Sequence, residues 1–518
     1  MNLRNLKLGS VFLLAFVSLA TAWAEDFTLT ILHTNDLHAH CEPVMVRGKS
    51  VGGYARQASA IIQTREESIN PILLNGGDTF QGTLYFNVYE GLSDLAFMNL
   101  IGYQAMAVGN HEFDKGPGPL ANFAKLARFP LLAANLDLSQ EPSLKDLIHP
   151  HVVLEVAGEK VGIVGAVTPD MLQITMAGPT VKMKDYVSSI QKSVDELTKN
   201  GVNKVILLTH SGLETDVEMA KKLRGVDIVV GGHSHSLLGH VEIPDFSGSR
   251  GEYPMLETDA AGQRVLIVQA WEWGKVLGKI ELKFDELGVI KSWTGTPILI
   301  DDTWPENPYV ASMMEAFKKP IEAAQKKVIG QLETDLSQRF SVENGEPLMG
   351  NVIADAVQAV TGPLGSVAAF WNQGGVRSAM EKGEVTYGKL VEVCPFGNSL
   401  MLLDLKGSEL LGALEHGLSG GGMLLPSKGF SYTFDLNAPA GKQILGASLK
   451  GEASDPQTTY KVTFSNFTAQ GGDGHTILKE AKGARLDTGF LDLEALLQFF
   501  EKNSPVRMTT EGRIIVKR

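Results

Sequence analysis

The sequence Ala105-Met106-Ala107-Val108-Gly109-Asn110-His111-Glu112-Phe113-Asp114 joins an apolar run to a polar cluster. The apolar residues predict a strand, and the polar residues predict the loop after it, where catalytic groups lie in α/β proteins. The amide of Asn110 can bind a hard metal ion, and the imidazole of His111 can move a proton. The carboxylate of Asp114 can hold that imidazole in one orientation. Taken alone, the loop is also compatible with an ordinary turn, so its meaning depends on the rest of the chain.

Strand and helix patterns alternate on both sides of this loop. Apolar runs such as Phe27–His33, Pro71–Leu74 and Val205–Thr209 alternate with helical stretches, and Gly158-Glu159 is a hairpin signal. βα units mixed with hairpins predict a layered α/β fold with mixed sheets. A predicted helix at Tyr309–Val328, ended by Gly330, connects this part to a second, smaller α/β unit. We therefore expect one domain over residues 25–305, a linker helix over 306–330 and a second domain over 331–518.

Residues 1–24 have the pattern of a secretory signal peptide. Arg4 and Lys7 precede the apolar run Val11–Ala20, and Ala22-Trp23-Ala24 has small residues at the positions of a cleavage site. We expect a secreted protein, in the periplasm of a Gram-negative bacterium, with no membrane span in the mature chain. The formal charge of −13 disfavours nucleic acid as a partner. Cys41 and Cys394 are too few for a disulfide scaffold, and the sequence does not decide whether they are linked.

Candidate metal ligands follow five of the predicted strands. Because strand ends can share one edge of the sheets, we expect these side chains to converge. Two carboxylates, one amide and four imidazoles suit zinc or manganese, and seven ligands are too many for one ion with an open position. They predict two ions bridged by one carboxylate, for which Asp78 is the best candidate, and such a pair suits in-line displacement at phosphorus. The seven residues are Asp36, His38, Asp78, Asn110, His210, His233 and His235.

The order of these motifs resembles the calcineurin-like metallophosphoesterases. With its second half included, the chain is similar to the 5′-nucleotidase family of bacterial periplasmic nucleotidases and UDP-sugar hydrolases and of animal ecto-5′-nucleotidase. The opening His33-Thr34-Asn35-Asp36-Leu37-His38 is a strong signature of that family. The resemblance implies a four-layer catalytic domain with a dinuclear site and a C-terminal substrate-binding domain that rotates about the linker helix. It implies that His111 and Asp114 form the catalytic dyad. It also implies one ion held by Asp36, His38, Asp78 and His235, and another by Asp78, Asn110, His210 and His233.

The second half carries groups that suit a nucleotide. Arg377 can hold an oxyanion, Phe396 and Phe467 can stack on the two faces of a base, and Asp473 can accept hydrogen bonds from ribose hydroxyls. The residues alone also allow core packing for each phenylalanine and a surface ion pair for the arginine. The resemblance implies substrate contacts for the whole set: Arg339, Asn372, Arg377, Phe396, Asn398, Phe467 and Asp473.

The implied function is a secreted hydrolase that removes phosphate from nucleoside 5′-monophosphates through metal-activated water, with two divalent ions as cofactors. Nucleotide sugars and dinucleotide pyrophosphates are further candidate substrates. The alternatives are a 2′,3′-cyclic nucleotide phosphodiesterase, a thiosulfohydrolase and a non-catalytic nucleotide-binding protein. The paired phenylalanines disfavour the thiosulfohydrolase, whose substrate has no base, and the full ligand set with His111 disfavours the non-catalytic protein. The sequence leaves the metal, the base preference and the choice between monomer and dimer open.

Overall fold

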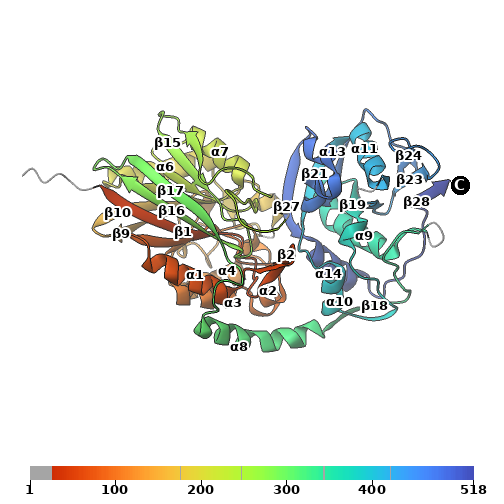
Figure 1. The fold of residues 1–518 in the computed structure, drawn as a ribbon, viewed down its shortest axis with the longest axis horizontal. Helices are drawn as coiled ribbons and strands as arrows, with labels where there is room; N and C mark the ends of the chain where they lie inside the picture. Colours follow the sequence, from red (N-terminus) through yellow and green to blue (C-terminus); the bar gives the residue numbers. More distant parts are fainter. Residues whose placement is uncertain are drawn as a thin grey trace, which may run out of the picture.

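The structure is a computed structural model that describes residues 26–175, 177–244, 246, 248–341, 345–419 and 422–517. The predicted signal peptide, residues 1–24, lies outside the described residues. Two domains lie side by side, and one long helix runs beneath both of them (Figure 1). Within the described part of the chain, no helix is long and apolar enough to cross a membrane.

Two mixed sheets form the centre of the first domain. Their facing sides share one apolar core, to which Ile31 and Ile72 contribute from one sheet and Val164 and Leu207 from the other. The predicted hairpin at Gly158-Glu159 is confirmed by the antiparallel pairing of β9 and β10. The first sheet has the order β17 (Ile290–Leu299), β16 (Val276–Phe284), β1 (Phe27–Thr34), β4 (Pro71–Asn75), β5 (Ala105–Ala107), β6 (Leu131–Leu132) and β8 (Ile148–His149). The second has the order β14 (Met255–Thr258), β15 (Arg264–Val268), β13 (Ile228–Val230), β12 (Val205–His210), β10 (Glu159–Val167) and β9 (His151–Val156).

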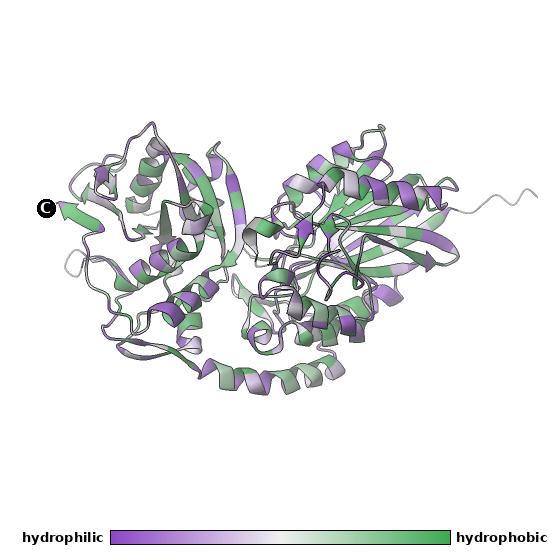
Figure 2. Cartoon of the chain, turned by 180° about the vertical axis from the view of Figure 1, so that it is seen from behind, coloured by the Kyte–Doolittle hydropathy of each residue, from purple (hydrophilic) through white to green (hydrophobic). Residues whose placement is uncertain are grey.

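Helices cover the outer face of each sheet and complete the predicted four layers. The first sheet is covered by α1 (Tyr54–Glu66), α3 (Leu92–Ile101) and α4 (Pro117–Leu126), and the second by α6 (Tyr186–Lys199) and α7 (Leu213–Lys222) (Figure 1). Apolar residues predominate in the central strands, whereas the helices carry many hydrophilic residues (Figure 2). This is the pattern of parallel strands buried on both faces.

The linker helix is α8 (Pro308–Gln325), which ends three residues before the predicted end at Val328. Its start follows local rules, since Pro308 occupies the first turn and the side chain of Asn307 accepts from the backbone N–H groups of Tyr309 and Val310. The prediction of its end was wrong because Val328 begins β18 (Val328–Leu332), which pairs with β20 (Gly383–Thr386). Gly330 therefore lies within a strand and does not terminate the helix.

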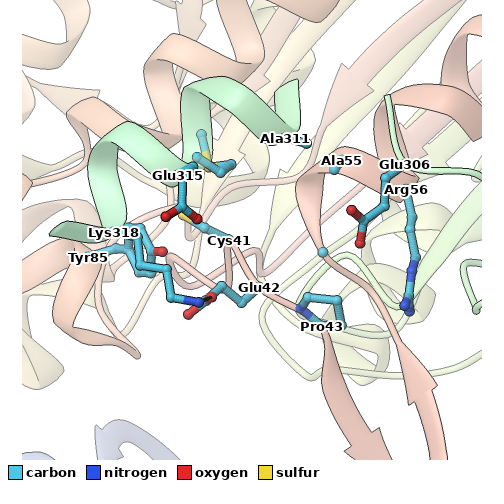
Figure 3. A pocket seen from close by; sticks show the side chains of 12 residues that line it. Cys41, Glu42, Pro43, Ala55, Arg56, Tyr85, Glu306, Ala311, Glu315 and Lys318 are labelled. Carbon is cyan, nitrogen blue, oxygen red and sulfur yellow. Dashed lines mark hydrogen bonds and ion pairs between the residues drawn. The ribbon is translucent and has the colours of Figure 1, made fainter. Parts of the chain in front are cut away.

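Side-chain contacts hold α8 against the first domain. The Lys318 ammonium lies 2.7 Å from a Glu42 carboxylate oxygen, and the Tyr89 hydroxyl donates to the Phe317 carbonyl at 2.8 Å. A pocket of about 190 Å³ remains between the helix and the domain, with Cys41 and Tyr85 among its lining residues (Figure 3). Cys41 and Cys394 are both buried free thiols.

The second domain is built on a five-stranded sheet with a smaller four-stranded sheet behind it. The helices α9 (Leu348–Thr361), α11 (Gly407–Leu418) and α14 (Asp492–Asn503) pack against these sheets. The larger sheet has the order β22 (Leu424–Pro426), β19 (Ala368–Asn372), β26 (Thr459–Ser465), β21 (Ser399–Lys406) and β27 (Arg485–Leu491). The smaller has the order β25 (Glu452–Ala453), β24 (Ile444–Leu449), β23 (Phe430–Asp435) and β28 (Ile514–Lys517). The edge strand β27 of the larger sheet faces the first domain (Figure 1).

Candidate functional site

All seven predicted ligands lie at or just beyond the carboxyl ends of parallel strands. Strands β1, β4 and β5 of the first sheet lead into the segments that carry Asp36, His38, Asp78 and Asn110. Strands β12 and β13 of the second sheet lead into those that carry His210, His233 and His235. The site therefore forms where the ends of the two sheets meet, as the sequence predicts.

The backbone at these positions is unusual. Five of the seven candidate ligands have a positive φ, with values from 48° to 77°. Residues other than glycine rarely adopt this left-handed region, and such conformations are held in place by surrounding structure at functional sites. The five are Asp36, His38, Asp78, His233 and His235.

The ligand atoms form two neighbouring groups, and each group draws on both sheets. One group is Asp36, His38 and His235, and the other is Asp78, His210 and His233; within each, the ligand atoms lie within 4.8 Å of one another. Oδ2 of Asp78 is 2.8 Å from His210 Nε2 and 3.9 Å from His38 Nε2, so this carboxylate reaches both groups. Asn110 Oδ1 lies 3.2 Å from His210 Nε2. The structure thus brings all seven side chains together around Asp78.

The hydrogen bonds of the imidazoles show that a cation fits this site. Nδ1 of His38 lies 2.9 Å from the Phe80 carbonyl, and Nδ1 of His210 lies 2.7 Å from the Gly76 carbonyl. Both acceptors keep the proton on Nδ1, so that each Nε2 presents a lone pair to the centre. His38 Nε2 is also only 3.1 Å from His235 Nε2. Because the Nδ1 atoms of both rings face acceptors on the outside, both Nε2 atoms point to the centre, where a metal ion or a shared proton can lie between them.

Burial and the surrounding charges favour the metal-binding protonation state at three of the candidate ligands, His38, His233 and Asp78. Burial lowers the pKa of His38 to about 4, and burial together with the charge of His210 lowers the pKa of His233 to about 4. Burial alone would raise the pKa of Asp78, but the charges of His210 and His111 outweigh it and hold the pKa well below its usual value. Neutral imidazoles and an ionised carboxylate are the forms that coordinate divalent ions. At His210 and His235 nearby carboxylates outweigh burial and raise the pKa, to about 9 for His210 and well above the usual value for His235, so that metal binding has to displace a proton from each.

The predicted dyad lies beside this centre. His111, at the start of the 3₁₀ turn η1 (His111–Phe113), places Nδ1 2.5 Å from Asp114 Oδ2, and Gln81 Nε2 donates to the same oxygen at 2.9 Å. Burial lowers the pKa of His111, but the charges of Asp114 and Asp78 outweigh it and raise the pKa to about 10. The His111 ring lies 5.2 Å from the ring of His38, between centroids. The imidazole is therefore a cation at neutral pH and lies next to the candidate metal ligands.

The sequence analysis missed Glu112, which organises two of the ligand loops. Its carboxylate is fully buried and accepts from the backbone N–H groups of Asp78, Thr79 and Phe80 at 3.1, 2.8 and 3.2 Å. It also accepts from the N–H of Gly109 at 2.6 Å. The signal in the sequence was an acidic residue in a loop between a metal ligand and a phenylalanine, and acids in that setting need buried partners.

The second domain closes over the centre in this arrangement. Ser399, Asp487, Gly489 and Leu491 face the metal ligands across a space of only about 10 Å³. A Cβ atom added to Gly489 would lie 2.8 Å from His111 Nε2 and 2.9 Å from Asn110 Nδ2. Strand β27 thus covers the candidate metal ligands and leaves almost no room beside them.

The predicted substrate residues lie elsewhere in the second domain. Asn372 Nδ2 donates to Asp473 Oδ2 at 2.8 Å, and the Arg377 guanidinium lies 5.5 Å from the Phe396 ring centroid. The side chains of Phe396 and Phe467 are 46% and 44% exposed, so neither is packed in the core. Arg339 is exposed, and Asn398 binds the Asp492 carboxylate through its side-chain amide at 2.9 Å. Among the described residues, those that line the space at the metal ligands include no member of this set.

Comparison with known proteins matches both halves of the chain to family models. Residues 29–237 match the calcineurin-like phosphoesterase model, and residues 328–480 match the 5′-nucleotidase C-terminal domain. The 5′-nucleotidase of Diplobatis ommata is 36% identical over 95% of this chain and 90% of its own length. The trifunctional nucleotide phosphoesterase protein YfkN of Bacillus subtilis is 34% identical over 94% of this chain, which spans about a third of that longer protein, 35% of its length.

Two solved structures extend the match to the whole fold. The 5′-nucleotidase precursor from Thermus thermophilus is 44% identical, with a TM-score of 0.64 over 95% of this chain and 99% of that one. The NAD nucleotidase of Haemophilus influenzae is 24% identical, with a TM-score of 0.80 over 95% of this chain and 100% of that one.

Proposed function

Because the chain belongs to the 5′-nucleotidase family, we propose that its seven converging side chains hold two divalent ions and release phosphate from nucleoside 5′-monophosphates. Its family makes it a metal-dependent phosphoric monoester hydrolase that acts on nucleotides. One observation carries the assignment of residues. Two three-residue groups of metal-binding side chains share the Asp78 carboxylate and lie beside the His111–Asp114 pair.

Zinc and manganese are the ions that this ligand set favours. One ion would be held by Asp36, His38, Asp78 and His235, and the other by Asp78, Asn110, His210 and His233. Imidazole and carboxylate ligands in these numbers suit such borderline ions. When bound, the two ions supply Lewis-acid charge that polarises the phosphoryl group and activates water.

The dyad supplies the proton chemistry of the reaction. With a pKa of about 10, His111 is an imidazolium at neutral pH, and its Nε2–H can donate to the phosphoryl or leaving oxygen as negative charge develops there. Asp114 fixes the orientation of the ring through Nδ1, and Gln81 holds Asp114 in turn. The dyad therefore needs no rearrangement of its own before it acts.

Recognition of the nucleoside belongs to the second domain in this proposal. Phe396 and Phe467 offer half-exposed rings to the two faces of a base, and Asp473 offers its carboxylate to the ribose. Asn372 orients Asp473, while Arg377 and Arg339 supply the positive charge that an anionic substrate needs. Asn398 supports the loop that carries Phe396 through its bonds to Asp492.

In this proposal the two domains have to move relative to each other before the metal centre and the nucleoside-binding residues can act on the same substrate. The space of about 10 Å³ under β27 excludes a nucleotide, so the second domain must turn before its substrate reaches the metal ligands. We propose α8 as the pivot between domains at 25–305 and 331–518, within the linker at 306–330. Support comes from the whole-chain TM-scores, since the structure with 44% identity matches less well, at 0.64, than the one with 24% identity, at 0.80. We propose that a different orientation of the two domains is the cause of this inversion.

The sequence pattern of residues 1–24 supports export of the protein, and we propose that it acts in the periplasm of a Gram-negative bacterium. Fractionation of cells that express the full chain tests this. The mature protein should appear in the periplasmic fraction with an N-terminus near residue 25.

A substrate panel tests the proposed activity. Protein reconstituted with Zn²⁺ or Mn²⁺ would be incubated with AMP, UDP-glucose, NAD, 2′,3′-cyclic AMP and thiosulfate, and product release would be measured for each. We expect the fastest release from AMP and none from thiosulfate. Release from thiosulfate alone, or from no nucleotide at all, would overturn the proposal. Removal of metal with a chelator should abolish the activity, and return of either ion should restore it.

A further inference from the structure

The partner of His235 differs in charge from the partners of two other candidate ligands. Nδ1 of His38 and Nδ1 of His210 both face backbone carbonyls, which are neutral acceptors. Nδ1 of His235 instead lies 2.5 Å from a carboxylate oxygen, Oε2 of Glu272. One of the two metal-binding groups therefore has an anion directly behind it.

A buried lysine holds this carboxylate in place. Lys275 is 2% exposed, and its ammonium lies 2.5 Å from Oε1 of Glu272. The same ammonium lies 3.8 Å from the ring centroid of Trp271 and 4.3 Å from that of Trp273, so both indoles contact it as cation–π partners. Each oxygen of Glu272 thus has a fixed partner, one of which is a candidate metal ligand.

The backbone around Glu272 is shaped to present it to the site. Trp271 and Trp273 have φ values of 58° and 57°, which are rare for bulky residues. The segment is tied to the first ligand loop, because the Trp273 N–H donates to the Asp36 carbonyl at 2.6 Å and Asn35 Nδ2 donates to the Trp271 carbonyl at 2.6 Å. A strained conformation that is held this firmly points to a role at the adjacent site.

We propose that Glu272 is a positioning residue of the metal centre, which orients His235 and strengthens its Nε2 as a ligand, with Lys275 as its anchor. A carboxylate that accepts from one ring nitrogen makes the other nitrogen a better donor to a metal, and loss of such a partner lowers metal affinity about 10–100-fold. This inference rests on the proposed role of His235 in metal binding. Because His235 belongs to the group of Asp36 and His38 only, Glu272 acts on one of the two ions.

Metal binding, measured without reference to activity, tests the proposal. The full-length wild type, Glu272→Gln, Glu272→Ala and His235→Ala would be titrated with Mn²⁺ against a chelator, with bound metal counted by mass spectrometry. Glu242→Gln is the matched control, since Glu242 is an exposed glutamate whose carboxylate pairs with the exposed His240. We expect Glu272→Gln to weaken one ion about tenfold and Glu272→Ala to weaken it more, up to about 100-fold, while the other ion and the control stay at wild-type affinity.

The outcomes separate this inference from the proposed function. If His235→Ala keeps both ions at wild-type affinity, His235 is not a ligand and the proposed metal site itself fails. If His235→Ala loses one ion while both Glu272 variants keep two at wild-type affinity, only the role of Glu272 is overturned. Equal weakening of both ions in Glu272→Gln, together with a lower melting temperature, would also overturn it, because it would show a general structural role.

Discussion

At the scale of single residues, the site depends on buried carboxylates that hold the candidate ligands in place and are not ligands themselves. Glu112 links the loop of Asp78 to the loop of Asn110, because its two oxygens accept N–H groups from both. The geometry of two candidate ligands therefore depends on a side chain that has no place in the predicted ligand set. Glu272 has a corresponding position behind His235.

Replacement of Glu112 by glutamine should damage both the fold and the site. The amide NH₂ would face a backbone N–H that now donates to a carboxylate oxygen, so one buried donor would lose its acceptor. We expect a loss of about 1–3 kcal/mol in the free energy of unfolding. Urea unfolding measures this, with bound metal determined on the same samples. Unchanged stability and metal content would contradict the assigned role of Glu112.

The pH dependence of turnover tests the dyad. Asp114 and Asp78 raise the pKa of His111 to about 10, so the imidazolium persists through neutral pH and is lost only in strongly alkaline solution. Asp114→Asn removes the largest of the raising charges, so the pKa of His111 should fall. If His111 acts as a proton donor, the alkaline decline of kcat should move to lower pH in this variant. An alkaline limb at the same pH in both proteins would remove His111 from that role.

At the scale of elements, the last strand of the chain, β28, is also held in place by a buried carboxylate. Glu346, which precedes α9, accepts from the backbone N–H groups of Glu511, Gly512 and Arg513 as the chain enters β28. The Arg513 guanidinium binds Asp355 of α9 through two bonds of 2.7 and 2.8 Å. The strand is therefore fixed to α9 by charge as well as by its pairing with β23.

Glu346→Ala should release this strand while the rest of the sheet stays folded. Four backbone N–H groups, those of Glu511, Gly512, Arg513 and Ile514, would lose their acceptor, and the strand lies at an edge of its sheet. We expect faster hydrogen exchange over residues 511–517 and unchanged exchange in β21 and β26. Hydrogen-exchange mass spectrometry checks both regions at once. Protection of 511–517 equal to that of the wild type would show that Glu346 does not anchor β28.

Helices and strands that are determined by their own local sequence could be predicted from it. The apolar runs of β1, β4 and β12 predicted their strands, and the polar residues after them predicted the ligands, because parallel strands end at a common edge. The end of α8 was missed because its cause is non-local: Val328 pairs with Thr386, 58 residues away by number. Glu272 was missed for a similar reason, since its partner His235 comes from another loop and the two meet only through a rare backbone conformation at Trp271 and Trp273.

At the scale of the whole molecule, the candidate metal ligands and the predicted nucleoside-binding residues lie in different domains. The seven candidate ligands and the predicted dyad follow strands of the two sheets of the first domain. Of the exposed phenylalanines of the second domain, Phe396 lies in a loop and Phe467 in the short helix α12 (Asn466–Ala469). In the arrangement described, β27 covers the ligands and leaves about 10 Å³. No sequence pattern predicts this, because it depends on how two separately folded domains are oriented.

The central claim is that the first domain cleaves the phosphate ester and the second recognises the base. A ratio of two specificity constants tests this claim. The measurement is kcat/KM for AMP divided by kcat/KM for ribose 5-phosphate, which has the same phosphate ester but no base. For the wild type, stacking of the base worth about 1–3 kcal/mol should favour AMP about 5–150-fold. The double variant Phe396→Ala/Phe467→Ala should lose most of that ratio and retain its activity on ribose 5-phosphate. His111→Ala should lower both rates together, about 10²–10⁴-fold, and leave the ratio unchanged. A ratio in the phenylalanine variant equal to that of the wild type would contradict the division between a catalytic and a recognition domain.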